Sequence, residues 1–129
     1  MVRGEVVSHP ETIATAIRIG NPARWHEAMA ALDESGGLID AVSDAEILQS
    51  WKWLASLEGL FVEPASATGV AVLHKQIEAG KLDPDGKTIV CVLTGHGLKD
   101  PDTAVAQAAQ PQRLPATLAA LERYLADSR

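Results

Sequence analysis

The sequence predicts an α/β protein in which helices are layered against a sheet, and two observations carry this prediction. Residues 88–93 form an almost unbroken run of β-branched and apolar residues, the pattern of a strand buried on both faces of a parallel sheet. Segments with apolar residues at helical spacing lie on both sides of that run. The resulting order of helix, strand, helix, helix, strand and helix is typical of an α/β architecture.

The first two helices are predicted from their end signals. Asn21 is a good N-cap and Pro22 suits the first helical position, so a helix is expected to start there and to end at residues 35–37, where glycine is available for a left-handed cap. Residues 43–46 then have the serine and glutamate spacing of a capping box. We expect that box to start a second helix, which ends at Gly59.

Two further helices are expected later in the chain. One covers residues 63–80 and opens with a Glu-Pro-Ala-Ser-Ala segment, in which the small residues allow another backbone to come close. The other covers residues 114–125, with leucines on one stripe. Residues 12–19 are interpreted as a loop or a short strand. Residues 101–113, which are rich in Pro, Ala and Gln, remain unassigned.

The predicted sheet is thin. Strands are expected at residues 37–42 and 88–93, with at most one more, whereas sheets usually hold about four to six strands. We therefore expect the fold within this chain to be incomplete. Cys91, the single cysteine, lies inside the second strand and is expected to be a buried, inert thiol.

Charge and hydropathy exclude several classes of partner. The formal net charge is −6, and no run of Lys and Arg offers the basic patch that neutralises phosphates, so nucleic acid is not an expected partner. No segment approaches the roughly 20 apolar residues of a membrane helix, and we see no signal peptide. A cytoplasmic protein without a membrane partner is expected. The scattered histidines lack metal-ligand spacing, so no metal site is predicted.

The candidate site follows the second predicted strand, at Thr94-Gly95-His96-Gly97. Ligands of open α/β sheets bind at the carboxyl ends of strands, and glycines allow close approach of the backbone. A hydroxyl at this point is therefore a natural contact for a small molecule. The same residues are equally consistent with a simple turn after the strand, in which the histidine is solvated. His96 has no partner that the sequence identifies, and a loop residue without a catalytic task is favoured.

Charged residues near this loop have simple structural interpretations. Glu63 begins a helix, where the helix dipole stabilises a carboxylate, and Ser66 at the same end could be a cap. Lys99 invites a Schiff-base role, but a lysine nucleophile is usually buried and uncharged. Asp100 and Asp102 would keep Lys99 charged, so we interpret this lysine as structural.

Three stretches resemble threonine synthases, which belong to the pyridoxal-phosphate-dependent fold type II (tryptophan synthase β-like) superfamily. They are residues 12–22 (TIATAIRIGNP), 58–67 (EGLFVEPASA) and 93–101 (LTGHGLKDP). The middle stretch is shared across the superfamily. The first and third are closer to threonine synthases than to dehydratases or racemases, which argues against a dehydratase-like elimination. The resemblance extends over roughly residues 6–103.

This resemblance implies a fold and a cofactor. The fold is a three-layer α/β/α domain with a mostly parallel sheet, of which residues 1–129 would be the C-terminal part. The cofactor is pyridoxal 5′-phosphate (PLP). Thr94 matches the residue whose hydroxyl bonds the pyridine nitrogen of PLP, and a hydroxyl leaves the ring a milder electron sink than an aspartate would.

The resemblance also implies further residues at the cofactor site besides Thr94. Ala16 and Ile17 match the loop that lies beside the cofactor ring. Glu63 matches a carboxylate near the ring edge, and whether it supports the cofactor or only the helix start stays open. Gly95 and Gly97 would let their loop approach the cofactor.

The implied reaction converts O-phospho-L-homoserine and water to L-threonine and phosphate. In the family, the lysine that holds PLP covalently and the Gly/Asn-rich loop for its phosphate lie upstream of the matched region, and neither is found in this sequence. No catalytic residue is therefore assigned, and the chain is expected to be a fragment that is inactive alone. The alternative is a non-catalytic binding or assembly module with the same fold. Expected partners are the missing N-terminal half or further copies of the chain, because the stripe Ile47, Trp51 and Leu54 is expected to lack a covering layer.

Overall fold

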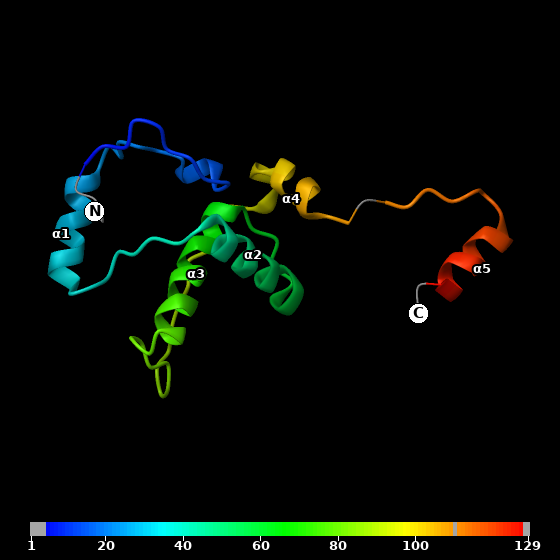
Figure 1. Ribbon diagram of the computed structural model, residues 1–129. Coiled ribbons are helices and arrows are strands. Elements are labelled where there is room, and N and C mark those ends of the chain that lie inside the picture. Colours follow the sequence, from blue (N-terminus) through cyan, green and yellow to red (C-terminus); the bar gives the residue numbers. More distant parts are fainter. Residues whose placement is uncertain (1–4, 110, 128–129) are drawn as a thin grey trace.

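The computed structural model describes residues 5–109 and 111–127, and the regular structure within them is helical (Figure 1). In chain order the elements are the short 3-10 helix η1 (Thr15–Ile17), α1 (Trp25–Ser35), α2 (Asp44–Glu58), α3 (Pro64–Glu78), the 3-10 helix η2 (Gly97–Lys99), α4 (Pro101–Gln107) and α5 (Leu118–Asp127). Helices α2 and α3 pack against each other, and η1 contacts α3. Helices α1 and α5 lie away from this pair (Figure 1).

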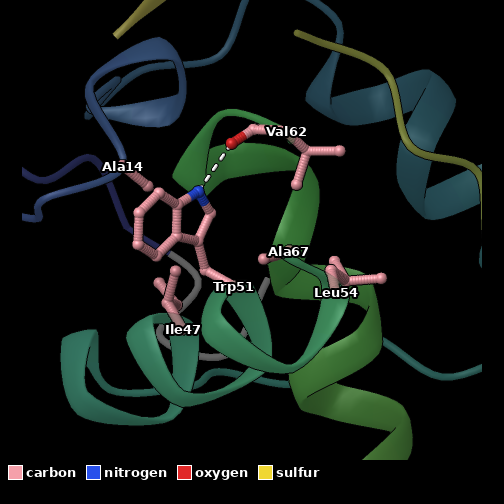
Figure 2. Packing of buried hydrophobic residues seen from close by; sticks show 6 residues of the cluster. All are labelled: Ala14, Ile47, Trp51, Leu54, Val62 and Ala67. Carbon is pink, nitrogen blue, oxygen red and sulfur yellow. Dashed lines mark hydrogen bonds between the residues drawn. The ribbon is translucent and has the colours of Figure 1, made fainter. Parts of the chain in front are cut away.

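The core lies between α2, the start of α3 and the chain around η1 (Figure 2). Ile47, Trp51 and Leu54 recur at helical spacing on α2 and are buried together with Ala67 of α3. The indole Nε1 of Trp51 donates to the carbonyl oxygen of Val62 at 2.6 Å, so the polar end of the buried ring has a partner. The expectation that this stripe lacks a covering layer is wrong, because α3 and the residues before it cover the stripe within the chain.

Local end signals place several helix ends correctly. The Ser43 Oγ accepts from the N–H of Glu46 at 3.3 Å, while the Glu46 carboxylate accepts from the Ser43 N–H at 2.6 Å, which confirms the predicted capping box. Gly36 and Gly59 end α1 and α2 with φ angles of 60° and 68°. Glycine adopts this left-handed conformation without the steric penalty of a Cβ atom. Pro64 opens α3, as predicted.

The start of α1 differs from the prediction. The helix begins at Trp25 rather than at Pro22, and Asn21 does not act as its N-cap. The backbone just before Asn21 is engaged elsewhere, since the Gly20 carbonyl accepts the Val7 N–H at 3.0 Å. This contact joins positions that are distant in sequence, so local capping preferences did not reveal it.

The C-terminal elements also differ. Helix α4 occupies part of the unassigned range 101–113, and the Asp100 side chain caps it by accepting the Thr103 N–H. Helix α5 begins at Leu118 rather than at residue 114, because Pro115 disfavours helical geometry in the residue before it. Within the described ranges no helix is long and apolar enough to cross a bilayer.

Neither predicted strand forms a ladder with any described segment. Residues 37–42 and 88–93 have no regular secondary structure among residues 5–109 and 111–127. A strand is stabilised by hydrogen bonds to a neighbour, and these segments have none to pair with here. Most of their apolar side chains are therefore exposed, as at Val90, which is 81% exposed, whereas Val42 and Leu93 are partly buried against the core. Cys91 is also exposed, so the prediction of a buried thiol is wrong.

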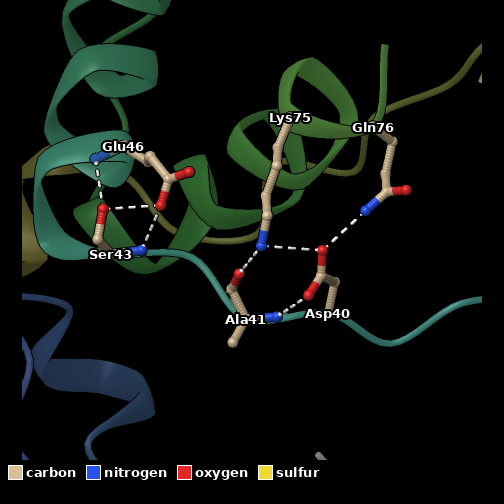
Figure 3. Close-up of polar contacts among 6 residues, drawn as sticks. All are labelled: Asp40, Ala41, Ser43, Glu46, Lys75 and Gln76. Carbon is tan, nitrogen blue, oxygen red and sulfur yellow. Dashed lines mark hydrogen bonds and ion pairs between the residues drawn. The ribbon is translucent and has the colours of Figure 1, made fainter. Parts of the chain in front are cut away.

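The segment before α2 is nevertheless held against α3 through polar contacts (Figure 3). The Lys75 Nζ lies 3.0 Å from Asp40 Oδ2 and donates to the Ala41 carbonyl at 2.6 Å. The Gln76 Nε2 donates to the same Asp40 oxygen at 2.7 Å. Hydrogen bonding from the Lys75 ammonium is the largest influence that lowers the pKa of Asp40. Side chains of α3 thus fix this segment where no strand partner does.

The capping box predicts a specific pH dependence of stability. The hydrogen bond from the Ser43 backbone N–H, followed by that from its hydroxyl, lowers the pKa of Glu46 below its ordinary value of 4.5. A carboxylate whose pKa is lowered by folding adds stability above its unfolded pKa, and this stability is lost as the pH falls through the folded pKa. We expect the melting temperature of Glu46→Gln to fall less than that of the wild type on acidification below about pH 4.5.

A second variant separates the two hydrogen bonds of the box. Ser43→Ala removes the hydroxyl and should lower stability by about 1 kcal/mol near neutral pH, because it removes the N-cap. It keeps the backbone N–H that most strongly lowers the pKa of Glu46, so most of the acid sensitivity should remain. Melting curves across an acid pH series measure both effects. Equal acid sensitivity in the wild type and in Glu46→Gln would contradict this assignment.

Candidate functional site

The candidate site forms where two segments distant in sequence pair next to the start of α3. An isolated antiparallel bridge joins the segment before α3 to the loop that begins at Thr94. The Glu63 N–H donates to the Gly95 carbonyl at 3.0 Å, and the Gly97 N–H donates to the Phe61 carbonyl at 3.1 Å. The loop is thereby held against the first turn of a well-packed helix, which can position its side chains.

Thr94 and Ser66 meet at this junction. The Thr94 Oγ1 lies 3.1 Å from the Ser66 Oγ, and either hydroxyl can be the donor. The Gly95 N–H donates to the Ser66 Oγ at 2.7 Å, and the Ser66 hydroxyl lies 3.3 Å from the Gly95 carbonyl oxygen. Ser66 is buried, whereas Thr94 is exposed. The expected cap role of Ser66 is thus not what its side chain does, because the hydroxyl bonds the loop rather than the end of its own helix.

Close packing explains two glycines of the loop. A Cβ atom added at Gly95 would lie 1.8 Å from the Glu63 Oε1, and one added at Gly97 would lie 2.4 Å from the Phe61 Cε2. Any side chain at either position would therefore displace its neighbour. The two glycines are required by close approach to the protein itself, which adds to the predicted reason that they allow approach to a ligand.

This packing makes Gly95→Ala destabilising. The new Cβ atom would force the buried Glu63 side chain out of its position, and overpacking of this kind costs about 1–3 kcal/mol. Gly69→Ala is a matched control on α3, because a Cβ atom there meets nothing within 4 Å and alanine favours a helix more than glycine does. Denaturant unfolding should show a loss for the first variant and a gain for the second; losses of equal size would contradict the packing argument.

Glu63 is the buried carboxylate of the site. It is 4% exposed, and its Oε1 lies 3.5 Å from the Nζ of Lys99, whose own side chain is mostly exposed. Glu63 occupies the N-cap position of α3, but its side chain makes no capping hydrogen bond. The side chain is directed to the loop and to Lys99 instead. Lys99 is therefore the ion-pair partner of Glu63, which supports a structural role for this lysine.

A cavity of about 470 Å³ lies beside Thr94. Its walls are mainly apolar and come from both segments of the bridge: Gly59, Leu60, Phe61, Val62, Leu93, Thr94, Gly95 and His96. Thr94 therefore lines a space that a small planar molecule could enter, with few other polar side chains around it.

The other two predicted cofactor residues lie elsewhere. Ala16 and Ile17 belong to η1, both are exposed, and Ile17 lines a different cavity together with Leu38 and Ile39. No described contact joins either residue to Thr94, so their cofactor role stays a prediction.

A link between η1 and the loop does exist one residue earlier. The Thr15 Oγ1 donates to Asp100 Oδ2 at 2.8 Å, across 85 positions of sequence. Asp100 is 8% exposed and also caps α4. This aspartate was not among the predicted site residues; the Asp-Pro pair at a helix start signals its cap, but nothing in the sequence signals the contact with Thr15.

His96 has a local structural task. Its Nδ1 accepts the Leu98 N–H at 3.1 Å, and its ring lies nearly perpendicular to that of Phe61 with centroids 5.5 Å apart. These contacts agree with the interpretation of His96 as a loop residue. In the part of the chain that the structure describes, no three His, Cys, Asp or Glu residues gather in a way that could hold a metal ion.

Comparison with known proteins gives a consistent family. Three similar proteins are threonine synthases: one from Halalkalibacterium halodurans is 57% identical over 105 residues, one from Synechocystis sp. is 59% identical over 104 residues, and one from Methanocaldococcus jannaschii is 50% identical over 117 residues. These alignments cover 81%, 81% and 91% of this chain but only 29%, 26% and 29% of the respective relatives.

A family profile matches as well. Residues 2–95, which include Thr94 and Gly95, match the family described as pyridoxal-phosphate dependent enzyme. This match spans well over half of the chain and contains most of the site built above. The chain therefore belongs to the family of pyridoxal-phosphate dependent enzymes.

Proposed function

We propose that this chain forms the end of a threonine synthase site that holds the ring nitrogen of PLP, with Thr94 as the contact to that nitrogen. The observation that carries the proposal is the position of Thr94, which lines a mainly apolar cavity and whose hydroxyl lies 3.1 Å from that of the buried Ser66. Identities of 50–59% to threonine synthases support the choice of reaction. The chain spans less than a third of the length of those relatives, so the activity belongs to a larger assembly of residues.

The residues at the junction fit the ring end of PLP. A hydroxyl can donate a hydrogen bond to an unprotonated pyridine nitrogen, and it does not hold a proton there as a carboxylate would. The cavity walls next to Thr94 are mainly apolar, which suits an aromatic ring. PLP, when bound, supplies an electron sink for the reaction.

The residues of the chain have separate tasks in this proposal. Thr94 orients the ring through its nitrogen. Glu63 is buried beside Gly95 and directed toward the same loop, which supports its proposed position near the ring edge. Ala16 and Ile17 flank the ring, and the bond between Thr15 and Asp100 supports this by tying η1 to the segment that follows Thr94.

Other parts of the site come from outside residues 1–129. The lysine that binds PLP covalently and the loop that binds its phosphate belong to the portion that precedes the matched region in the family. In the proposed assembly, residues 1–129 are the C-terminal part of an α/β domain. Segments 37–42 and 88–93 are then strands of a mostly parallel sheet, and their exposed apolar side chains support this role. Self-association of the chain stays a prediction.

Reconstitution tests the proposal. The part of the Halalkalibacterium halodurans threonine synthase outside the matched 105 residues, here called the complementary portion, is produced as a separate polypeptide. It is mixed with this chain, PLP and O-phosphohomoserine, and release of phosphate and threonine is measured. We expect product from the mixture and none from either polypeptide alone.

Each other outcome has a defined meaning. Product from this chain alone would contradict the proposed origin of the lysine. A stable complex that releases no product would favour the non-catalytic assembly module. Failure of the two polypeptides to associate would contradict the proposed C-terminal role.

A further inference from the structure

We propose that Ser66 is a positioning residue, which turns the Thr94 hydroxyl so that its proton points toward the ring nitrogen of PLP. This inference rests on the proposed function for its final step. Its structural basis is independent of any ligand: the buried Ser66 hydroxyl lies 3.1 Å from the Thr94 hydroxyl and accepts the Gly95 N–H at 2.7 Å.

The hydrogen bonds available to the Ser66 hydroxyl determine the direction in which the Thr94 hydroxyl donates. The Ser66 Oγ already accepts one hydrogen bond and has one proton to donate, either to the Gly95 carbonyl oxygen at 3.3 Å or to the Thr94 Oγ1 at 3.1 Å. In the first case the Thr94 proton is directed back to Ser66. In the second case Thr94 accepts from Ser66, and its own proton is free for an outside acceptor.

An unprotonated ring nitrogen is such an acceptor, so the ligand would select the second arrangement. The bonds then run in one direction, from the Gly95 N–H to the Ser66 hydroxyl, to the Thr94 hydroxyl and on to the ring. Hydrogen bonds aligned in this way polarise and strengthen one another.

The location of Ser66 suits it to this task. It lies in the first turn of α3, whose backbone is anchored there by the bond from the Ser66 N–H to the Glu63 carbonyl at 3.0 Å. Thr94 belongs to no regular element, and its partner is 28 positions away in sequence. Ser66 thus links the Thr94 side chain, which lies outside any regular element, to a packed helix.

The first measurement uses the chain without cofactor. Three-bond NMR couplings from the Thr94 methyl carbon to its backbone N and C′ report the χ1 rotamer. We expect one rotamer in the wild type and rotamer averaging in Ser66→Ala. Ser66→Cys fills nearly the same space but is a weak donor, so it should also show averaging even if alanine disturbs the fold. Thr68→Ala is the matched control, because that α3 hydroxyl bonds the Ala65 carbonyl instead.

The second measurement uses the chain assembled with the complementary portion. Affinities are compared for PLP and for an analogue with carbon in place of the ring nitrogen. The wild type should prefer PLP by about tenfold, the effect of one hydrogen bond to the nitrogen. In Ser66→Cys this preference should shrink toward one while the affinity for the analogue is unchanged. A purely structural role would weaken both ligands equally.

The outcomes separate the two proposals. Unchanged Thr94 couplings in both Ser66 variants would overturn the positioning role. Averaged couplings with an unchanged ligand preference would overturn its relevance to the ring nitrogen. A wild-type assembly that binds both compounds equally, or binds neither, would overturn the proposed function, and the couplings would still decide whether Ser66 orients Thr94.

Discussion

Replacing Trp51 by alanine is expected to lower the free energy of unfolding by about 3–5 kcal/mol, the range for loss of a buried aromatic side chain. The indole lies at the centre of the core between α2 and η1 (Figure 2), and its Nε1 holds the Val62 carbonyl. Val62 is itself one of the two residues paired in the isolated bridge at the site. Loss of the indole should therefore loosen the site as well as the core, and denaturant unfolding followed by circular dichroism measures the energetic cost.

Two variants divide this effect into its parts. Trp51→Phe keeps most of the volume but leaves the Val62 carbonyl without the indole donor, so a smaller loss of about 1–3 kcal/mol is expected. Trp53→Ala removes the same side chain two positions away, where the ring is only half-buried against His74. Its loss should be clearly smaller than that of Trp51→Ala. Similar losses at both tryptophans would contradict the proposed location of the core.

Replacing Thr94 by valine is expected to weaken PLP binding to the assembled protein by about tenfold, because the variant keeps the shape but loses one hydrogen bond to the ring. Thr94→Ser keeps the hydroxyl and should retain most of the affinity. Thr88→Val makes the same change six positions earlier and should bind as the wild type does. Titration of PLP into each assembly measures the affinities, and wild-type affinity in Thr94→Val would remove Thr94 from the site.

Helices were predictable where their signals are local. The Ser43 and Glu46 capping box, the glycines after α1 and α2, and Pro64 at the start of α3 all act within one helical turn, and the structure confirms them. The start of α1 and the formation of the sheet depend on contacts with residues that are distant in sequence. The pairing of Gly20 with Val7 could not be read from capping preferences.

The predicted strands show the same limit more strongly. The apolar pattern of residues 88–93 indicates a segment suited to burial, but a ladder also requires neighbouring strands, and the described residues supply none. Exposure of Cys91 follows from this missing cover. The pattern therefore identified a segment suited to a buried strand, although the segment forms no strand in this chain.

The site was predictable only in part for a related reason. The resemblance identified Thr94, Glu63 and Gly95, and the structure brings these three together at one junction. It gave no indication of Ser66 or Asp100, because their roles arise from contacts across 28 and 85 positions. Side chains that position other side chains carry no local signature, so structure was needed to find them.

In the proposed assembly, this chain supplies the ring-nitrogen contact of the PLP site, and the lysine comes from the complementary portion. Borohydride reduction of the assembled protein with bound PLP, followed by peptide mass spectrometry, locates the lysine that carries the cofactor. We expect the label on a lysine of the complementary portion, and we expect its yield to fall in the Thr94→Val assembly. A label on Lys99, or on any other lysine of this chain, would contradict the claim.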